Sequence, residues 1–195
     1  MISAIILAAG QSKRMGQPKM LLPWGNITVI EHVITTFLHA GIEDVIVVTG
    51  GAREQVENTI NQYHIRKVHN NDYATGGMLS SIQCALRAMP DEARAALIGL
   101  GDQPQVQEKS VRLICDEYRD SQSRLIVPSF QMRRGHPWLV ARPLWSEILA
   151  LKPPESLRDF LNRHADKIHY VIVDTPSVLA DLDTPEDYQR SHPKE

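Results

Sequence analysis

Short apolar runs alternate with amphipathic stretches along most of the chain. The apolar runs predict strands at 2–7, 44–49, 65–69, 95–100, 124–127, 138–140 and 168–173. The stretches between them carry helical spacing, capping residues or helix-stop residues. They predict helices at about 29–40, 52–62, 78–89, 107–120 and 143–151, with short helices from 156 and from 185. This alternation predicts βαβ units, right-handed crossovers and a mainly parallel sheet.

The order of the predicted elements is typical of a three-layer α/β fold, in which a doubly wound, mainly parallel sheet lies between helices, as in Rossmann-like proteins. One segment interrupts the alternation. The strands at 124–127 and 138–140 follow each other without a helix, which predicts a small hairpin-like insertion near 124–141. Since no repeat or low-complexity linker divides the 195 residues, we expect a single domain.

Composition narrows the class of protein. Hydrophobic residues make up 43% of the chain and charged residues 23%, as in a soluble globular protein. The net charge of −2 argues against general nucleic-acid binding, and no apolar run approaches the roughly 20 residues that span a bilayer. The run at 2–7 leads at once into a glycine-bearing, basic segment, so we expect a strand there and not a signal peptide. Cys84 and Cys115 are expected to be reduced thiols on helices, consistent with a cytoplasmic location.

The segment 8–19 directly follows the first predicted strand and contains two glycines, flanking small residues and three cations. Exposed backbone N–H groups and cations both neutralise phosphate oxygens, so a strand that opens into such a loop favours phosphate binding. A tight turn with solvated cations is the alternative interpretation. The segment contains neither a Walker A sequence nor Gly-x-Gly-x-x-Gly, so it lacks the common nucleoside triphosphatase and dinucleotide fingerprints.

Acidic residues follow two other predicted strands. Asp102 comes directly after the strand at 95–100, and Asp183 follows the last strand after a short loop. Ligands of open α/β sheets bind beyond the carboxyl ends of the strands, so we expect both acids near the first loop. Mg²⁺ prefers one or two carboxylates together with phosphate oxygens and water. Each acid alone is also explained as a turn or helix-capping residue.

The motifs that carry the chemistry occur in a fixed order. The first reads Leu7-Ala8-Ala9-Gly10-x-Ser12-x-Arg14-Met15-Gly16-x-Pro18-Lys19-x-Leu21-Leu22. It is followed by Gly77-Met78-x-x-Ser81, Gly99-Leu100-Gly101-Asp102-Gln103-Pro104, Gly135-His136-Pro137 and Asp181-x-Asp183-Thr184-Pro185-Glu186-Asp187. This series resembles the signature of the MobA-like nucleotidyltransferases, and most closely their molybdenum cofactor cytidylyltransferase branch. The resemblance spans nearly the whole chain.

The resemblance implies an enzyme that transfers CMP from CTP to the terminal phosphate of the molybdopterin cofactor and releases pyrophosphate. Positioning and charge neutralisation would supply the catalysis, because the acceptor phosphate is itself the nucleophile. Residues 1–105 would bind the nucleotide, and 106–195 the acceptor. The implied partners are these two small molecules and a molybdoenzyme or its insertion chaperone, and neither nucleic acid nor a membrane is expected.

The same resemblance assigns roles to individual residues. It implies that Arg14, Lys19 and Asp102 are catalytic, with Arg14 and Lys19 on the charges of the triphosphate, and that Asp102 and Asp183 hold Mg²⁺ or Mn²⁺. The residues implied in nucleotide binding are Ala8, Ala9, Gly10, Ser12, Arg14, Lys19, Ser80 and Ser81. The residues implied in acceptor binding are Arg133, Arg134 and His136.

Two residues of the first loop bear on the choice of base. The guanylyl branch tends to carry Gly at the position of Ala9 and Asp at the position of Pro18, so the chain is more similar to the cytidylyl branch. One departure falls in the helix after Ser81, where Ala85 stands at a position at which relatives often carry glycine.

Three other functions fit the same motifs. One is nucleotidyl transfer from GTP, or to another phosphorylated acceptor such as a sugar or polyol phosphate. Another is a non-catalytic chaperone for the molybdenum cofactor. The third is an NAD(P)H-dependent reductase, an activity assigned to a relative of this fold, which the absence of Gly-x-Gly-x-x-Gly disfavours.

Overall fold

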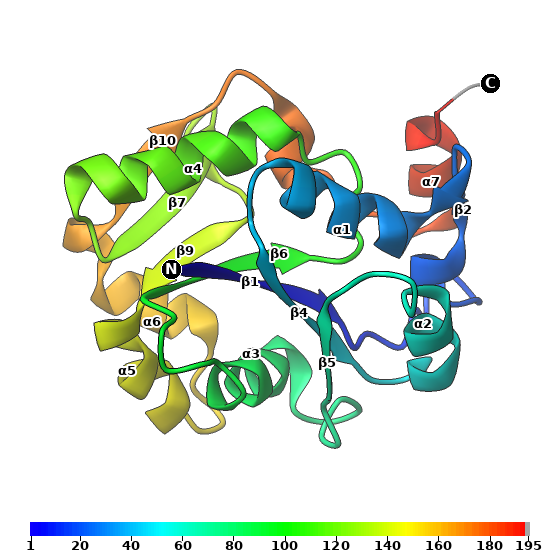
Figure 1. Ribbon diagram of the computed structural model, residues 1–195, viewed down its shortest axis with the longest axis horizontal. Helices are drawn as coiled ribbons and strands as arrows, with labels where there is room; N and C mark the ends of the chain where they lie inside the picture. Colours follow the sequence, from blue (N-terminus) through cyan, green and yellow to red (C-terminus); the bar gives the residue numbers. More distant parts are fainter. Residues whose placement is uncertain (194–195) are drawn as a thin grey trace.

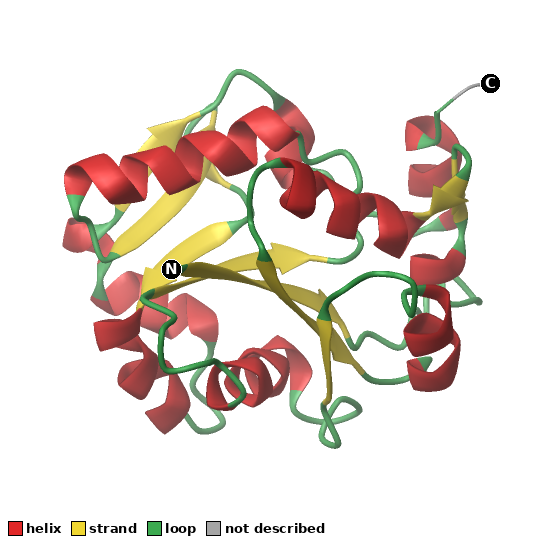
Figure 2. Ribbon diagram, viewed as in Figure 1, coloured by secondary structure: helices red, strands yellow, loops and turns green. Residues whose placement is uncertain are grey.

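A twisted central sheet separates two layers of helices (Figure 1 and Figure 2). The computed structural model describes residues 1–193. Within this range the sheet has eight strands, with β10-β7-β9-β6-β1-β4-β5 side by side and β8 paired with β7. The strands are β1 (Ile2–Ala8), β4 (Asp44–Thr49), β5 (Arg66–His69), β6 (Ala95–Leu100), β7 (Leu125–Phe130), β8 (Arg133–Arg134), β9 (Trp138–Ala141) and β10 (His169–Ile172). The three-layer α/β fold expected from the sequence is confirmed.

The alternation of side chains along β1 explains the two layers. Ala4 and Ile6 point to one face, which is covered by α1 (Val29–His39), α2 (Arg53–Thr59) and α4 (Glu108–Ser121). Ile5 and Leu7 point to the other face, which is covered by α3 (Gly77–Arg87), α5 (Trp145–Ala150) and α6 (Leu157–Arg163). Both faces of the sheet are therefore buried, as in α/β proteins.

Helix α1 shows how local sequence and packing agree. A capping box begins it: the Thr28 amide donates to Oε2 of Glu31 at 2.9 Å, and Oγ1 of Thr28 accepts from the Glu31 amide. The helix turns its apolar stripe to the sheet, where the Phe37 ring lies against Gly99 of β6. A Cβ at position 99 would collide with this ring, so the glycine sets how closely α1 approaches the sheet.

The segment near 124–141 forms the expected hairpin, but it is part of the central sheet. Strand β9 lies between β6 and β7 and pairs antiparallel with both. On the other side of β6, the strands β6, β1, β4 and β5 pair with one another in parallel. Leu139 and Val140 are 0% and 1% exposed. These neighbouring residues point to opposite faces, so both faces of β9 are buried under the two helix layers.

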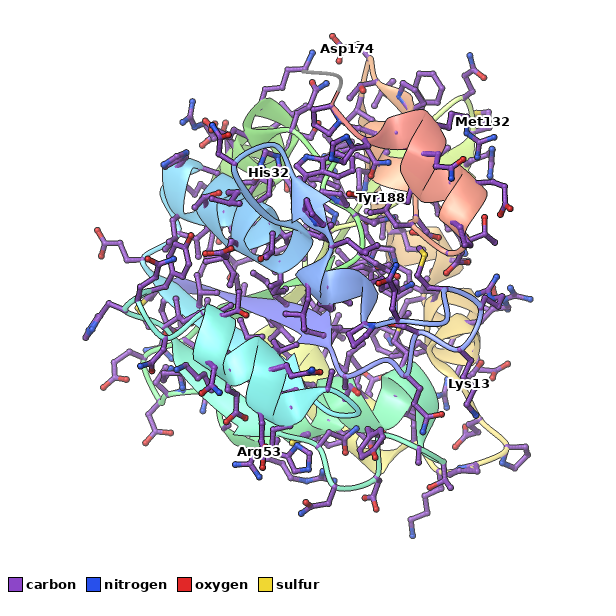
Figure 3. All side chains as sticks on the ribbon, turned by 90° about the vertical axis from the view of Figure 1, so that its right-hand side faces the viewer. Lys13, His32, Arg53, Met132, Asp174 and Tyr188 are labelled. Atoms are coloured by element: carbon purple, nitrogen blue, oxygen red, sulfur yellow. The ribbon has the colours of Figure 1, made fainter. Side chains whose placement is uncertain are left out.

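A small third cluster closes the structure beyond the carboxyl ends of β1 and β4. It consists of Met15, Leu22, Trp24, Val29 and Leu182, with Tyr188 packed against it. Trp24 belongs to a separate two-stranded hairpin, β2 (Pro23–Trp24) and β3 (Ile27–Thr28), and Tyr188 to α7 (Pro185–Ser191). The Tyr188 hydroxyl donates to the Pro23 carbonyl at 2.7 Å. Figure 3 looks onto this side of the protein and labels Tyr188.

Within residues 1–193, the helices are too short or too polar to cross a membrane.

Candidate active site

A cavity of about 400 Å³ opens where β1 and β6 end. Its wall includes the loop after β1, the segment from Tyr73 to Ser81 that leads into α3, and Leu100 and Asp102 at the end of β6. Asp183 is the one lining residue that comes from the part of the chain after 105, within the described residues. The cavity therefore lies where ligands bind in open α/β sheets.

The loop after β1 is held in shape by its own hydrogen bonds. The Ser12 carbonyl accepts from the amides of Met15 and Gly16, and Oγ of Ser12 accepts from the Lys19 amide at 3.1 Å. Ser12 has a φ of 51° and Gly16 a φ of 71°, so the chain turns through the left-handed region twice. These bonds fix the backbone at Lys19, whose side chain enters the cavity.

Lys19 connects two acids that are far apart in sequence. Its Nζ donates to Oδ2 of Asp102 at 2.5 Å and to Oδ1 of Asp183 at 3.2 Å, and Arg14 lies 2.8 Å from Oδ2 of Asp183. The Lys19 side chain is only 11% exposed. Burial lowers the pKa of Lys19, but the charges and hydrogen bonds of Asp102 and Asp183 outweigh it, so this pKa lies above its usual value of 10.5. The lysine is therefore a cation at any physiological pH.

Close packing and backbone bonds bring Asp102 and Asp183 to the same place. Gly101 precedes Asp102, and a Cβ there would lie 2.9 Å from the Leu7 carbonyl, so the end of β6 follows the end of β1 closely. The Leu182 amide donates to the Asp102 carbonyl at 3.0 Å. Asp181 accepts a hydrogen bond from Nε2 of Gln103 at 2.6 Å. These contacts join the segment before α7 to the end of β6.

Most of the sequence-predicted nucleotide residues meet at the cavity. Its lining includes Ala9, Gly10, Ser12, Arg14, Lys19 and Ser81. Ala8 does not line it, because its side chain is 2% exposed and packs in the core on the α1 side. Ser80 does not line it either. Its hydroxyl donates to the Gly77 carbonyl and accepts from Asn70.

Sequence reasoning missed Asn70, which organises this wall of the cavity. Asn70 is 3% exposed, and its Nδ2 donates to Oγ of Ser80 at 2.9 Å and to Oγ of Ser81 at 3.0 Å. Its Oδ1 accepts from the Asp72 amide, which shapes the loop toward Tyr73. Asn is typical of such local turns, so its place at the start of the polar loop was the available signal.

The three residues expected to bind the acceptor lie outside the cavity lining. Arg133 and Arg134 are exposed on β8, and Nε of Arg134 donates to the Tyr170 hydroxyl at 2.8 Å. The His136 ring stacks on Trp138 with 4.4 Å between centroids. Burial lowers the pKa of His136 to about 4, so the imidazole is neutral at physiological pH. Its Nδ1 lies 3.5 Å from the carbonyl of Ile98, two residues before Leu100 of the cavity wall.

The donor set suits a hard divalent cation that is also bound by phosphate. In residues 1–193 no three His, Cys, Asp or Glu side chains are placed to hold one metal ion. Asp102 and Asp183 place two carboxylates beside the basic loop, a donor set that would suit Mg²⁺, which prefers one or two carboxylates together with phosphate oxygens and water. In the structure the Lys19 ammonium bridges these carboxylates, which shows that they lie close enough to share one cation.

Comparison with known proteins identifies the family of this chain. The model of the MobA-like NTP transferase domain matches residues 4–168, which include the loop after β1 and Asp102. The chain belongs to the MobA-like NTP transferase family. The site therefore occupies the nucleotidyltransferase fold of that family, as the sequence motifs predict.

Relatives of the MobA-like family differ in their reported activities. The chain is 33% identical to the molybdenum cofactor cytidylyltransferase of Escherichia coli strain K12, over 96% of this chain and 93% of that protein. It is 28% identical to the nicotine blue oxidoreductase of Paenarthrobacter nicotinovorans, over 97% and 95% of the two chains.

Solved structures of other proteins superpose closely on this chain. The crystal structure of Rv0371c from Mycobacterium tuberculosis H37Rv has a TM-score of 0.85 at 28% identity and covers 97% of this chain and 96% of that one. A structure of the same protein in complex with manganese has a TM-score of 0.82 at 27% identity, with coverage of 98% and 97%.

Proposed function

We propose that the protein transfers CMP from CTP to the terminal phosphate of the molybdopterin cofactor and releases pyrophosphate. The observation that carries the nucleotidyl transfer is the cluster of Arg14, Lys19, Asp102 and Asp183 in the cavity after β1. The choice of CTP and of the acceptor rests on the similarity to the cytidylyltransferase of Escherichia coli.

In this reaction an oxygen of the acceptor phosphate attacks the α-phosphorus of CTP. A new P–O bond forms, the bond between the α-phosphorus and the bridging oxygen breaks, and pyrophosphate leaves with its electron pair. No protein nucleophile is required, so the chain acts by orientation and by charge. Amides of Gly10 and its neighbours bind the phosphates, and Arg14 and Lys19 neutralise them.

Binding of the triphosphate requires Lys19 to exchange partners. In the structure its ammonium neutralises Asp102 and Asp183. We propose that it turns to the phosphate oxygens when CTP enters, and that Asp102 and Asp183 then hold Mg²⁺ or Mn²⁺. Such a cation, when bound, supplies charge neutralisation at the phosphates. The structure of Rv0371c in complex with manganese, which is 27% identical to this chain, supports the proposal of a divalent cation.

The cavity wall and the resemblance together assign the nucleoside end of the donor. Ser81, which lines the cavity, is proposed to contact the ribose or base together with Ser80. The resemblance to the cytidylyl branch at Ala9 and Pro18 favours cytosine. Residues 1–105 form most of the cavity, which supports their assignment to the donor. The assignment of 106–195 to the acceptor relies on Arg133, Arg134 and His136. Delivery of the product to a molybdoenzyme or its chaperone belongs to the same proposal.

The oxidoreductase relative favours a second candidate function. Nicotine blue oxidoreductase aligns with nearly the whole chain, so an oxidoreductase on this scaffold is the alternative to nucleotidyl transfer. The basic loop and the two acids favour transfer, because a reductase needs no carboxylates opposite the phosphates of its cofactor.

Pyrophosphate release separates these functions. Purified protein is incubated with Mg²⁺, molybdopterin cofactor and each nucleoside triphosphate in turn. Release of pyrophosphate with CTP alone supports the proposal. Release with GTP alone would make GTP the donor and the reaction a guanylyl transfer. Binding of the cofactor without release from any triphosphate would favour a chaperone, whereas oxidation of NAD(P)H in a parallel assay would favour the reductase.

A further inference from the structure

The two carboxylates of Asp181-Leu182-Asp183 have different partners. Asp183 faces the cations Lys19 and Arg14. Asp181 instead accepts the 2.6 Å hydrogen bond from Nε2 of Gln103. Two acids separated by one residue could both serve as ligands, and their spacing alone does not distinguish them. The contacts do, because one acid points at the cation cluster and the other at a buried amide.

The side-chain amide of Gln103 is buried and only partly hydrogen-bonded. The residue is 3% exposed, and its Oε1 has no hydrogen-bond partner in the described part of the chain. Burying an amide oxygen without a partner costs free energy. Within residues 1–193, the bond to Asp181 is the one hydrogen bond that the side-chain amide of Gln103 makes. Such a cost points to a function for this bond.

The position of Gln103 suggests what that function is. It follows Asp102 directly, so the end of β6 carries one proposed metal ligand and also contacts the segment that carries the other. The Leu182 amide bonds to the Asp102 carbonyl at 3.0 Å, and the Leu182 side chain is 0% exposed. The segment is thus attached to β6 through its backbone and through Asp181. Both attachments set the position of Asp183.

We propose that Gln103 and Asp181 form a positioning pair that holds Asp183 beside Asp102, and that Asp181 is not itself a metal ligand. This inference rests on the metal-dependent transfer proposed above. It is consistent with the finding that, in the described residues, Asp181 does not join the other two acids as a third ligand of one ion. Residues that orient metal ligands by hydrogen bonds contribute substantially to metal affinity.

The experiment titrates Mn²⁺ into the full chain with each nucleoside triphosphate present and follows free Mn²⁺ by electron paramagnetic resonance. Asp181→Asn keeps an acceptor oxygen for Gln103, so it should bind Mn²⁺ almost as tightly as the wild type. Asp181→Leu and Gln103→Leu remove the bond and should each weaken Mn²⁺ binding by about 10-fold or more. The double Leu variant should lose little more than either single one, because both remove the same contact. Asp183→Asn should lose most.

Two results would overturn the positioning pair. Equal losses in Asp181→Asn and Asp183→Asn would make Asp181 a ligand, and unchanged Mn²⁺ affinity in both Leu variants would remove the positioning role. The affinity of each Leu variant for the triphosphate is also measured without metal. It should equal that of the wild type, because loss of the Gln103–Asp181 bond should not affect the phosphate-binding loop, whereas general unfolding would lower it. If the wild type binds Mn²⁺ only with a triphosphate other than CTP, the proposed choice of CTP is wrong. The Gln103 and Asp181 variants are then compared in the presence of that other triphosphate. If the wild type binds no Mn²⁺, the pair is refuted as well.

Discussion

Lys19 bridges Asp102 and Asp183 in the structure, and in the proposed function it exchanges these partners for phosphate oxygens. Without a ligand, its ammonium neutralises two acids that would otherwise repel each other across the cavity mouth. With a triphosphate, the same charge is needed on the phosphates. The positive charge of Lys19 is present at every pH below the usual 10.5 and is lost only as pH rises through the raised pKa of this residue. Changes near neutral pH therefore do not switch it.

Replacing Lys19 with Met tests the phosphate contact. A charge-assisted hydrogen bond is worth about 1.5–3 kcal/mol, so CTP should bind about 10-fold to 100-fold more weakly in Lys19→Met. Isothermal titration calorimetry measures the affinity. The matched control is Lys167→Met, since Lys167 is exposed and precedes β10 at the other edge of the sheet. Unchanged affinity in Lys19→Met would remove this residue from the phosphate site.

His136 gives a prediction on pH. Its pKa is lowered from 6.5 to about 4, so below about pH 6.5 the unfolded chain takes up a proton that the folded protein does not. Stability should therefore fall between pH 7 and pH 5, by about 2 kcal/mol from this residue. Urea unfolding of His136→Phe, which keeps an aromatic ring against Trp138, should show a pH dependence smaller by that amount. An identical pH dependence in both proteins would contradict the buried, neutral imidazole.

At the scale of elements, the end of the chain completes the site. Helix α7 begins with a capping box in which Thr184 accepts from the Asp187 amide and Asp187 accepts from the Thr184 amide. Its first residues directly follow Asp183. The cap therefore fixes the backbone just after a proposed metal ligand, while Tyr188 attaches the helix to the Pro23 carbonyl.

Removing that cap should affect both stability and the site. Thr184→Ala is expected to cost about 1 kcal/mol of unfolding free energy, the usual value of a Thr cap. Ser156→Ala removes the equivalent capping box of α6, on the other helix layer, and should cost a similar amount. Only Thr184→Ala should also weaken Mn²⁺ binding in the presence of a triphosphate. Equal Mn²⁺ affinity in the two variants would show that the start of α7 does not position Asp183.

The elements also show what sequence could and could not predict. The βαβ order, the loop after β1 and the convergence of Asp102 with Asp183 follow from periodicity and from the rule on strand ends. The place of β9 was missed, because pairing partners of a strand depend on the whole sheet and its local sequence shows only a hairpin. The hydrogen bond of Gln103 was missed for a similar reason, because a buried amide has no sequence pattern that separates it from an exposed one. The place of Asn70 at the start of a polar loop predicts a turn, but not its burial or its bonds to Ser80 and Ser81.

At the scale of the molecule, one scaffold serves relatives with different reported activities. The chain aligns over more than nine-tenths of its length with a cytidylyltransferase and with an oxidoreductase, so the fold alone does not select the reaction. The selection falls to the side chains at the carboxyl edge of the sheet. There the basic loop and the acids from two distant segments form one cluster, and this cluster is the basis of the proposed transfer.

The most direct test of that proposal follows the α-phosphate itself. CTP labelled at the α-phosphorus is incubated with Mg²⁺ and molybdopterin cofactor, using the wild type and Asp102→Asn, whose amide oxygen still accepts from Lys19. We predict that label moves to the cofactor with the wild type, and that the variant folds and binds CTP but transfers no label. Transfer by Asp102→Asn at the wild-type rate, or no transfer from CTP by the wild type, would contradict the account.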